Sequence, residues 1–418
     1  MWYPNFAFTI IITGITIQQA RADADLVFDP EGYNRGRYGP HPHQYYHSAD
    51  IVSPLLLVNR WDPTKADNAS YIFLTLNSPV DDGIAGPIIY RADDLSLVYS
   101  EPRWSVAHNA HVDQFNGSDY LVLIAQSRLR ILAYSESLVD SSGLKKTSEG
   151  DFLVSARHTH SIIFVDRQSG RVRWALGGKN NDFVDISAGN ATDFAWQHAA
   201  RFNNAALTQL TMFDNHNVSS TIGCTTSCSR GKHVELDYRA HTVRLISEFY
   251  HPEGLVSGFE GNYQTMQSGN VFLGWGANPT FTEHIPSGEC ILDVQFDLWR
   301  PDEGYPINYR AFKMNWKAYP TWDPSISVHG VSPLGYYKVY VSWNEATEVT
   351  KWRLLVGTSH DSVTNSIAVV PRAGFETEIL LKPSLPFVRA VALDRDGMIL
   401  GMTTVVQLVA YDVIVDVS

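Results

Sequence analysis

One phrase recurs along this chain: a turn of Gly with Asp or Asn, followed by a strand of alternating aromatic and aliphatic residues. Examples are Gly117–Ile124, Gly150–Ser155 and Gly269–Trp275, and a related turn-and-strand phrase carries Trp174 or Phe249. Such turns join the strands of β-hairpins. Repeated hairpins with one aromatic each are typical of propeller blades of about 40 to 50 residues. With almost no helical periodicity elsewhere, the pattern predicts an all-β fold.

The chain has 418 residues, which is too long for one ordinary core and favours two modules. Residues 25–310 have room for five or six propeller blades, which leaves open whether the ring is complete. Residues 311–418 carry a run of short strands with turn signals between them, which predicts a small β-sandwich. We expect Trp343 and Trp352 to lie in the core of that sandwich.

The N-terminus and the sequons indicate export. An apolar run from Phe6 to Ile17 is too short to span a bilayer, and Ala20 and Ala22 suit signal peptidase, so residues 1–22 are predicted to be a signal peptide. An uncleaved N-terminal membrane anchor is the alternative. Four Asn-x-Ser/Thr sequons add to this interpretation and predict a secreted glycoprotein. They begin at Asn68, Asn116, Asn190 and Asn217.

Three cysteines do not form a disulfide framework, although Cys224 and Cys228 are close enough to pair and would leave Cys290 over. The net charge of −12 argues against nucleic acid and anionic membranes as partners. An anionic small molecule remains compatible with this charge if its site is locally positive. His41, His43 and His47 suggest metal ligands, but an exposed loop is the preferred interpretation, and no metal or cofactor is expected.

Candidate functional residues concentrate in the run Ser155–His160, where Arg157, His158 and His160 follow a short apolar strand. Inward-pointing cations and imidazoles cost solvation free energy, so they are usually retained for anion binding or proton transfer. If the strand continues, Arg157 and Thr159 share one face and His158 and His160 the other. A salt bridge for Arg157 and a structural core position for His198 are the competing interpretations.

These residues belong to longer motifs that resemble the arylsulfotransferase (arylsulfate sulfotransferase) family, in its fungal-type secreted branch. The motifs are Asp151–His160, Gly170–Lys179, Phe194–Phe202, Gly269–Gly276 and Val341–Trp352. The resemblance runs from about Pro40 to about Val405.

The resemblance implies a six-bladed propeller that transfers a sulfuryl group from a phenolic sulfate ester to a phenol, without a nucleotide donor. It implies a sulfo-histidine intermediate on His198 and an arginine, Arg157, that holds the sulfuryl oxygens. His158, His108 and His111 are the candidates for protonating the leaving phenolate and binding substrate. The sequence does not indicate the oligomeric state.

The chain departs from the family at one motif. The family carries the phrase Asp-x-x-His-x-Asn-Ser-Val shortly before the equivalent of Arg157, whereas Ile131–Asp140 contains no His. A catalytically impaired propeller that binds a ligand or a protein is therefore the alternative function.

Overall fold

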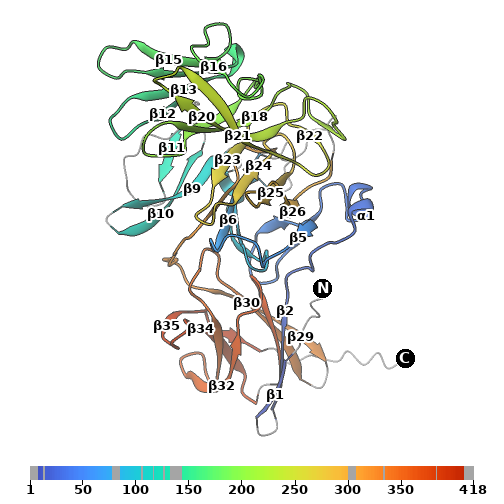
Figure 1. Cartoon of the computed structure of the whole chain (residues 1–418). Coiled ribbons are helices and arrows are strands. Elements are labelled where there is room, and N and C mark those ends of the chain that lie inside the picture. The colour runs from blue at the N-terminus through green and yellow to red at the C-terminus, as the bar shows by residue number, and fades with distance from the viewer. Residues whose placement is uncertain are drawn as a thin grey trace.

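The computed structural model describes residues 8–12, 15–77, 85–104, 107–115, 117–125, 128–131, 144–299, 307–332, 335–382 and 384–408. Strands make up 49% of the chain and helix 3%, so the fold is all-β as expected. Blade-like sheets form one body, and a smaller sandwich lies beside it (Figure 1).

Within the described residues, five sheets form the propeller. Blade 1 contains β6 (Tyr71–Asn77), β7 (Gly86–Arg91), β8 (Leu97–Ser100), β27 (Ile307–Asn308) and β28 (Phe312–Met314). Blade 2 contains β9 (Ala107–Phe115), β10 (Ser118–Ala125) and β11 (Arg128–Ile131). Blade 3 contains β12 (Leu144–Lys146), β13 (Phe152–Ala156), β14 (Ser161–Val165) and β15 (Val172–Gly177).

The remaining two sheets follow in chain order. Blade 4 contains β16 (Val184–Asp185), β17 (His198–Phe202), β18 (Gln209–Asp214), β20 (Arg230–Asp237) and β21 (Thr242–Tyr250). Blade 5 contains β23 (Asn262–Thr265), β24 (Val271–Gly274), β25 (Thr280–His284), β26 (Cys290–Gln295) and β5 (Leu57–Trp61). The strands predicted from the repeated turn-and-strand phrases are confirmed as β10, β13, β15, β21 and β24.

Distant parts of the chain close the propeller by strand pairing. β5, from the N-terminal part, is the outer strand of blade 5 beside β26, and β27 and β28 pair with β6 in blade 1. The buried Lys313 ammonium donates to Glu283 Oε2 at 2.7 Å and to the Asp67 carbonyl at 2.8 Å, across the same junction. Pairing both ends of the chain into sheets protects strand edges that would otherwise be exposed.

Strands of neighbouring blades lie against one another, which arranges the blades around one centre. β6 lies against β9, β13 against β17, and β17 against β23, while β24 lies against β28. Between blades 2 and 3 the chain passes through residues 132–143, which lie outside the described residues. The segment in which the family's histidine phrase is missing falls there.

Two further sheets form the C-terminal sandwich. One contains β1 (Phe8–Ile12), β2 (Ile15–Arg21), β33 (Thr377–Leu381), β30 (Tyr336–Ser342) and β29 (Ser325–Ser332). The other contains β32 (Val363–Pro371), β31 (Lys351–Gly357), β34 (Phe387–Leu393), β35 (Ile399–Met402) and β36 (Val406–Gln407). They enclose an apolar core that includes Val341, Trp343, Trp352 and Ile379, so both tryptophans lie where the sequence predicted.

The boundary at residue 311 requires correction, because the chain does not leave the propeller there. β28 begins at Phe312 and pairs with β6, and Trp316 packs in the blade core against Tyr71 and Phe73. The sandwich strands begin only at Ser325.

The N-terminal segment contributes to the same sandwich. β2 pairs with β33, and the amide of Ala22 donates to the Glu376 carbonyl at 3.0 Å. Removal of residues 1–22 remains a prediction. Such removal would take β1 and β2 from this sheet and leave β33 at its edge.

Short elements connect these sheets. They are α1 (Pro30–Asn34), β3 (His43–Tyr45), β4 (Val52–Pro54), the 3-10 turn η1 (Pro102–Trp104), β19 (Thr221–Ile222) and β22 (Leu255–Val256). Cys224 and Cys228 form a disulfide in the loop between β19 and β20, and Cys290 is a free, half-buried thiol. No helix in the described part of the chain is long and apolar enough to cross a membrane.

Candidate active site at the propeller centre

Five polar residues, one from each blade, are linked at the centre of the propeller, and we call them the central cluster. They are Asn109 (blade 2), Arg157 (blade 3), His198 (blade 4), Glu260 (the loop entering blade 5) and Arg310 (between β27 and β28).

Hydrogen bonds and charges connect the central cluster. The Glu260 amide donates to His198 Nε2 at 3.3 Å, and Arg310 Nη1 donates to Asn109 Oδ1 at 3.0 Å. Arg157 and Arg310 are both close enough to act on the charge state of His198. Segments up to 201 positions apart in the chain thus meet at one site.

Asn215 fixes the tautomer of His198. The Asn215 amide nitrogen donates to the carbonyl oxygens of Ser257 and Glu260 at 2.8 and 3.0 Å, so Oδ1 faces the imidazole. His198 Nδ1 lies 2.7 Å from that oxygen and therefore carries the proton. Nε2 then carries the lone pair, which accepts the hydrogen bond from the Glu260 amide at 3.3 Å. An imidazole in this tautomer can act as a nucleophile once that hydrogen bond gives way to the substrate.

The surroundings of His198 keep it uncharged. Its pKa is lowered to about 4, chiefly by burial. The positive charges of Arg157 and Arg310 also lower the pKa, whereas the hydrogen bond to Asn215 opposes the shift. His198 is therefore neutral throughout the physiological range.

Arg157 is a half-buried cation that forms no ion pair with an acidic side chain in the described part of the chain. Its Nη2 donates to the Gly258 carbonyl at 2.9 Å, and its guanidinium lies over the Trp196 ring at 5.0 Å. Its Nε is buried and has no hydrogen-bond partner in the described part of the chain, where Arg157 also forms no ion pair. The described residues therefore show no salt bridge for Arg157.

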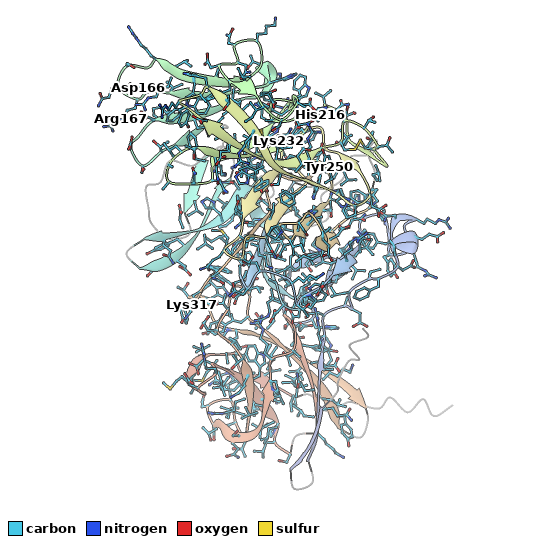
Figure 2. All side chains as sticks on the ribbon, viewed as in Figure 1. Asp166, Arg167, His216, Lys232, Tyr250 and Lys317 are labelled. Atoms are coloured by element: carbon cyan, nitrogen blue, oxygen red, sulfur yellow. A yellow bond between two sulfur atoms is a disulfide. The ribbon has the colours of Figure 1, made fainter. Side chains whose placement is uncertain are left out.

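The buried cations of blade 4 are paired with carboxylates, unlike Arg157 within the described residues. Arg230 contacts Asp214 at 3.1 Å and Glu248 at 2.9 Å, and Lys232 contacts Glu248 at 2.9 Å. Lys232, and Tyr250 on the neighbouring strand, mark this network in Figure 2. Its charges compensate one another, so it holds blade 4 together rather than attracting an anion.

The alternation expected for Arg157–His160 is wrong, because β13 ends at Ala156 and Arg157–Thr159 form a 3-10 turn, η2. The turn gathers side chains that a strand would separate. The rings of His158 and His160 lie 5.4 and 4.9 Å from Trp196, on which Arg157 also stacks. His158 is exposed, so it lies at the rim of the site.

Gly177 and Gly178 hold this turn in place. Both have positive φ, and a Cβ on either one would come within 2.8 Å of the His160 or Thr159 carbonyl oxygen. They allow β15 to end directly against η2, which agrees with the prediction of a turn after a strand rather than a phosphate loop.

The two histidines of blade 2 lie on the other side of the central cluster. His108 Nδ1 is 3.3 Å from the Asn77 amide nitrogen, its ring is 5.2 Å from that of Tyr309, and burial lowers its pKa. His111 Nδ1 lies 2.8 Å from the Asn109 carbonyl oxygen, and its ring packs 6.1 Å from Phe312. Neither contacts His198 directly, so their substrate-binding role remains a proposal.

Arg310 and Glu260 were missed by sequence reasoning. Arg310 follows a short strand, as Arg157 does, and the same solvation argument could have found it. Glu260 lies between Gly258 and Gly261 in a loop, and no pattern in the sequence indicates that its neighbour is His198.

Several residues in and around the central cluster have a strained backbone. Non-glycine residues with positive φ include Asn109 (60°), His160 (51°), Trp196 (58°), Ala199 (53°) and Glu260 (62°). Each such residue costs about 1–3 kcal/mol, and strain of this kind is typical of functional sites.

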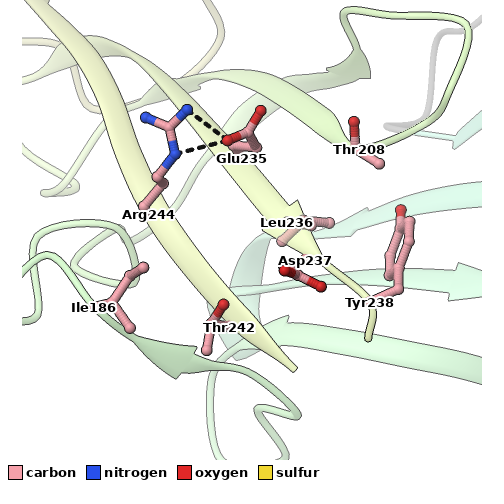
Figure 3. Close-up of a pocket in the computed structure, with 8 residues that line it drawn as sticks. All are labelled: Ile186, Thr208, Glu235, Leu236, Asp237, Tyr238, Thr242 and Arg244. Atoms are coloured by element: carbon pink, nitrogen blue, oxygen red, sulfur yellow. Dashed lines mark hydrogen bonds and ion pairs between the residues drawn. The ribbon is translucent and has the colours of Figure 1, made fainter. Parts of the chain in front are cut away.

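A hollow of about 460 Å³ lies elsewhere, at the outer end of blade 4 (Figure 3). Arg244 and Glu235 form an ion pair in its wall. Asp237 in the same wall accepts from the amides of Arg239 and Ala240, and none of the lining residues belongs to the central cluster. Within the described residues, no group of three or more His, Cys, Asp or Glu could hold a metal ion.

The β-propeller thus holds a neutral imidazole near two guanidinium groups, an arrangement with the local positive charge that an anionic group requires. The family model described as Arylsulfotransferase (ASST) matches residues 99–297, which include four members of the central cluster but not Arg310. The match supports an arylsulfotransferase-like domain. No curated protein matches the chain by sequence.

Solved structures were also compared with the chain. Catalytically inactive virginiamycin B lyase from Staphylococcus aureus, with quinupristin, is 10% identical, with 78% of this chain and 99% of that chain covered and a TM-score of 0.24. The PQQ-bound aldose sugar dehydrogenase from Streptomyces coelicolor is 14% identical, with 63% and 78% covered and a TM-score of 0.24. At such TM-scores the superpositions carry no argument, and the fold assignment depends on strand pairing.

Proposed function

We propose that this protein transfers a sulfuryl group from a phenolic sulfate ester to a phenol through a sulfo-histidine on His198. The observation that carries the proposal is the His198 tautomer: Asn215 holds the Nδ1 proton, and Nε2 presents a lone pair beside two cations. The family match to residues 99–297 supports the same reaction class.

In the first step, Nε2 attacks sulfur and the bond from sulfur to the phenolic oxygen breaks. The sulfuryl group is now bound to Nε2, the proton stays on Nδ1 in its hydrogen bond to Asn215 Oδ1, and the phenolate oxygen takes up a proton as it leaves. In the second step, the oxygen of an acceptor phenol attacks sulfur and loses its proton, the bond from Nε2 to sulfur breaks, and neutral His198 is restored. Such a covalent intermediate predicts ping-pong kinetics.

Arg157 would bind the sulfuryl oxygens. Its planar guanidinium has a buried Nε without a partner in the described residues, and it can donate two parallel hydrogen bonds to an oxyanion. The cation Arg310, on the other side of His198, would add to the positive potential. This local field offsets the net charge of −12 and admits an anionic substrate.

The proposal includes secretion, in the fungal-type branch that the motifs resemble. The Cys224–Cys228 disulfide supports an oxidising compartment. Asn68, Asn190 and Asn217 are exposed and accessible to glycosylation, whereas Asn116 lies outside the described residues.

The test is to incubate the protein with a radiolabelled aryl sulfate, quench it, and map the label by peptide mass spectrometry. We expect label on His198 that is chased by a phenol acceptor and is absent from the His198→Ala variant. His233→Ala, which removes another half-buried imidazole of blade 4, is the matched control and keeps the label. Folded wild-type protein that yields neither product nor label contradicts the proposal.

A second candidate follows from the absence of His in Ile131–Asp140. A propeller that binds an aryl sulfate without transferring it would keep the central cluster but show no turnover. Binding by calorimetry without product in the same incubation would favour this function.

A further inference from the structure

We propose that Glu260 is the general acid and base of the site, in place of the histidine that the chain lacks. This inference rests on the proposed function. Its carboxyl group would give a proton to the departing phenolate oxygen and take one from the acceptor phenol.

The first argument is position. The Glu260 amide donates to His198 Nε2 at 3.3 Å, so the residue is a direct neighbour of the atom that would attack sulfur. Asn215 orients His198 and also binds the Glu260 carbonyl oxygen, which couples both residues to one amide side chain. Arg310 acts electrostatically on both the imidazole and the carboxyl group.

The second argument is that the carboxyl group is not used structurally. The two fully buried glutamates are saturated: Glu283 binds the Lys313 ammonium, and Glu376 accepts from two backbone amides and a hydroxyl. Glu260 Oε2 is buried without a hydrogen-bond partner in the described part of the chain. An unpaired buried carboxyl group costs free energy, and such groups are retained mainly where they react.

The third argument is strain. Glu260 has a φ of +62°, although the loop offers Gly258 and Gly261 on either side. The loop is packed closely, since a Cβ on Gly276 would come within 2.7 Å of the Glu260 backbone. A glycine would adopt this φ without strain. A strained glutamate at this position, with glycines at 258 and 261, is therefore typical of a residue that is retained for function.

The charge state fits the role. Burial raises the pKa of Glu260 to about 7, and the positive charge of Arg310 only partly opposes this. The charged and titratable groups around it are Arg310, His198 and, through Gly258, Arg157. A general acid works best with a pKa near the working pH.

The proton balance is complete. Protonated Glu260 gives its proton to the phenolic oxygen as the bond from sulfur to oxygen breaks and Nε2 bonds to sulfur. Ionised Glu260 then accepts the proton of the acceptor phenol as that oxygen attacks sulfur and the bond from Nε2 to sulfur breaks. The enzyme returns to its starting state without another reactant.

The test compares Glu260→Gln with wild type on two donors. Phenol has a pKa of about 10 and needs protonation to leave, so kcat/KM for phenyl sulfate should fall about 10²–10⁴-fold. Nitrophenyl sulfate has a better leaving group, so its kcat/KM should fall much less.

The pH profile is the second readout. In wild type, kcat/KM should decline below pH about 4, where His198 becomes protonated, and above pH about 7, where Glu260 loses its proton. The upper decline should be absent from Glu260→Gln.

Glu345→Gln is the matched control, because burial also raises the pKa of Glu345 to about 7 and this residue lies outside the central cluster. It should behave as wild type. Equal losses on both donors, or an upper decline that persists in Glu260→Gln while His198 is still labelled, would overturn the role of Glu260 alone. Folded wild type that is inactive on both donors would overturn the proposed function as well.

Discussion

The propeller centre and the C-terminal sandwich treat polar groups and strain in opposite ways. The sandwich encloses apolar side chains such as Val341, Trp352 and Ile379. From Ser325 to Leu408, Glu345 is the one described non-glycine residue with positive φ. The centre instead gathers two guanidinium groups, an imidazole and a carboxyl group, with strained residues around them.

The difference indicates that the sandwich core stabilises the fold, whereas the propeller centre contains features that destabilise it. Apolar burial contributes about 25 cal/mol per Å², and the sandwich core has little to offset against that gain. The centre carries strain and unpaired polar atoms that weaken the fold. Substitutions in the two regions should therefore separate stability from activity.

Trp352→Ala should have the largest effect on stability. Trp352 is 1% exposed in the sandwich core, and truncating a buried aromatic costs about 3–5 kcal/mol in free energy of unfolding. Chemical denaturation followed by tryptophan fluorescence measures this loss. The rate per folded molecule should stay at the wild-type value, because no sandwich residue belongs to the central cluster.

Met398→Ala is the control for the sandwich, since Met398 is 66% exposed and its removal should leave stability almost unchanged. A large loss of rate per folded molecule in Trp352→Ala would show that the two regions are coupled. The comparison would then fail.

Arg157→Ala should show the reverse pattern. Losing one donor to a developing oxyanion lowers kcat about 10²–10³-fold. Stability should change little, because Arg157 has one hydrogen bond to the Gly258 carbonyl and no ion pair within the described residues. Steady-state kinetics and thermal unfolding of the same samples measure both quantities.

Arg173→Ala removes a positive charge from the same blade and is the matched control. Arg173 pairs with Asp166 at 2.6 Å on the surface, so its loss should not change kcat. If both variants lose activity equally, a general field effect rather than binding of sulfuryl oxygens would explain the result.

Much of the fold could be predicted from the sequence because alternation and turns are local signals. The short strands expected in the C-terminal part include β31, Lys351–Gly357, which carries the core residue Trp352. β29 was not predicted, although Ser325–Val328 alternates polar and aliphatic residues, because His329 and Gly330 interrupt the pattern. β28 was assigned to the wrong module, because pairing with β6, 240 positions earlier, leaves no local trace.

The site was only partly predictable for a related reason. Arg157 and His198 lie within motifs, whereas Arg310 joins the centre only when the last propeller strands pair with the first blade. Local geometry also mattered, since the Thr159 hydroxyl donates to the Ala156 carbonyl at 3.2 Å in a turn that the alternating pattern does not reveal.

Asn215→Ala should lower the rate less than Arg157→Ala does. Asn215 does not contact sulfur in the proposed reaction but holds the proton on Nδ1 and the ring in place. Without it, the proton can move to Nε2 and the ring can turn, which should lower kcat by up to about 100-fold. The Ser257 and Glu260 carbonyl groups also lose a donor, which should cost about 1–3 kcal/mol in stability.

Nitrogen-15 NMR of the histidines reports the tautomer directly, and Asn204→Ala, in a turn of blade 4, is the control. A His198 that keeps its Nδ1 proton and full activity in Asn215→Ala would mean that the strained backbone alone positions the imidazole.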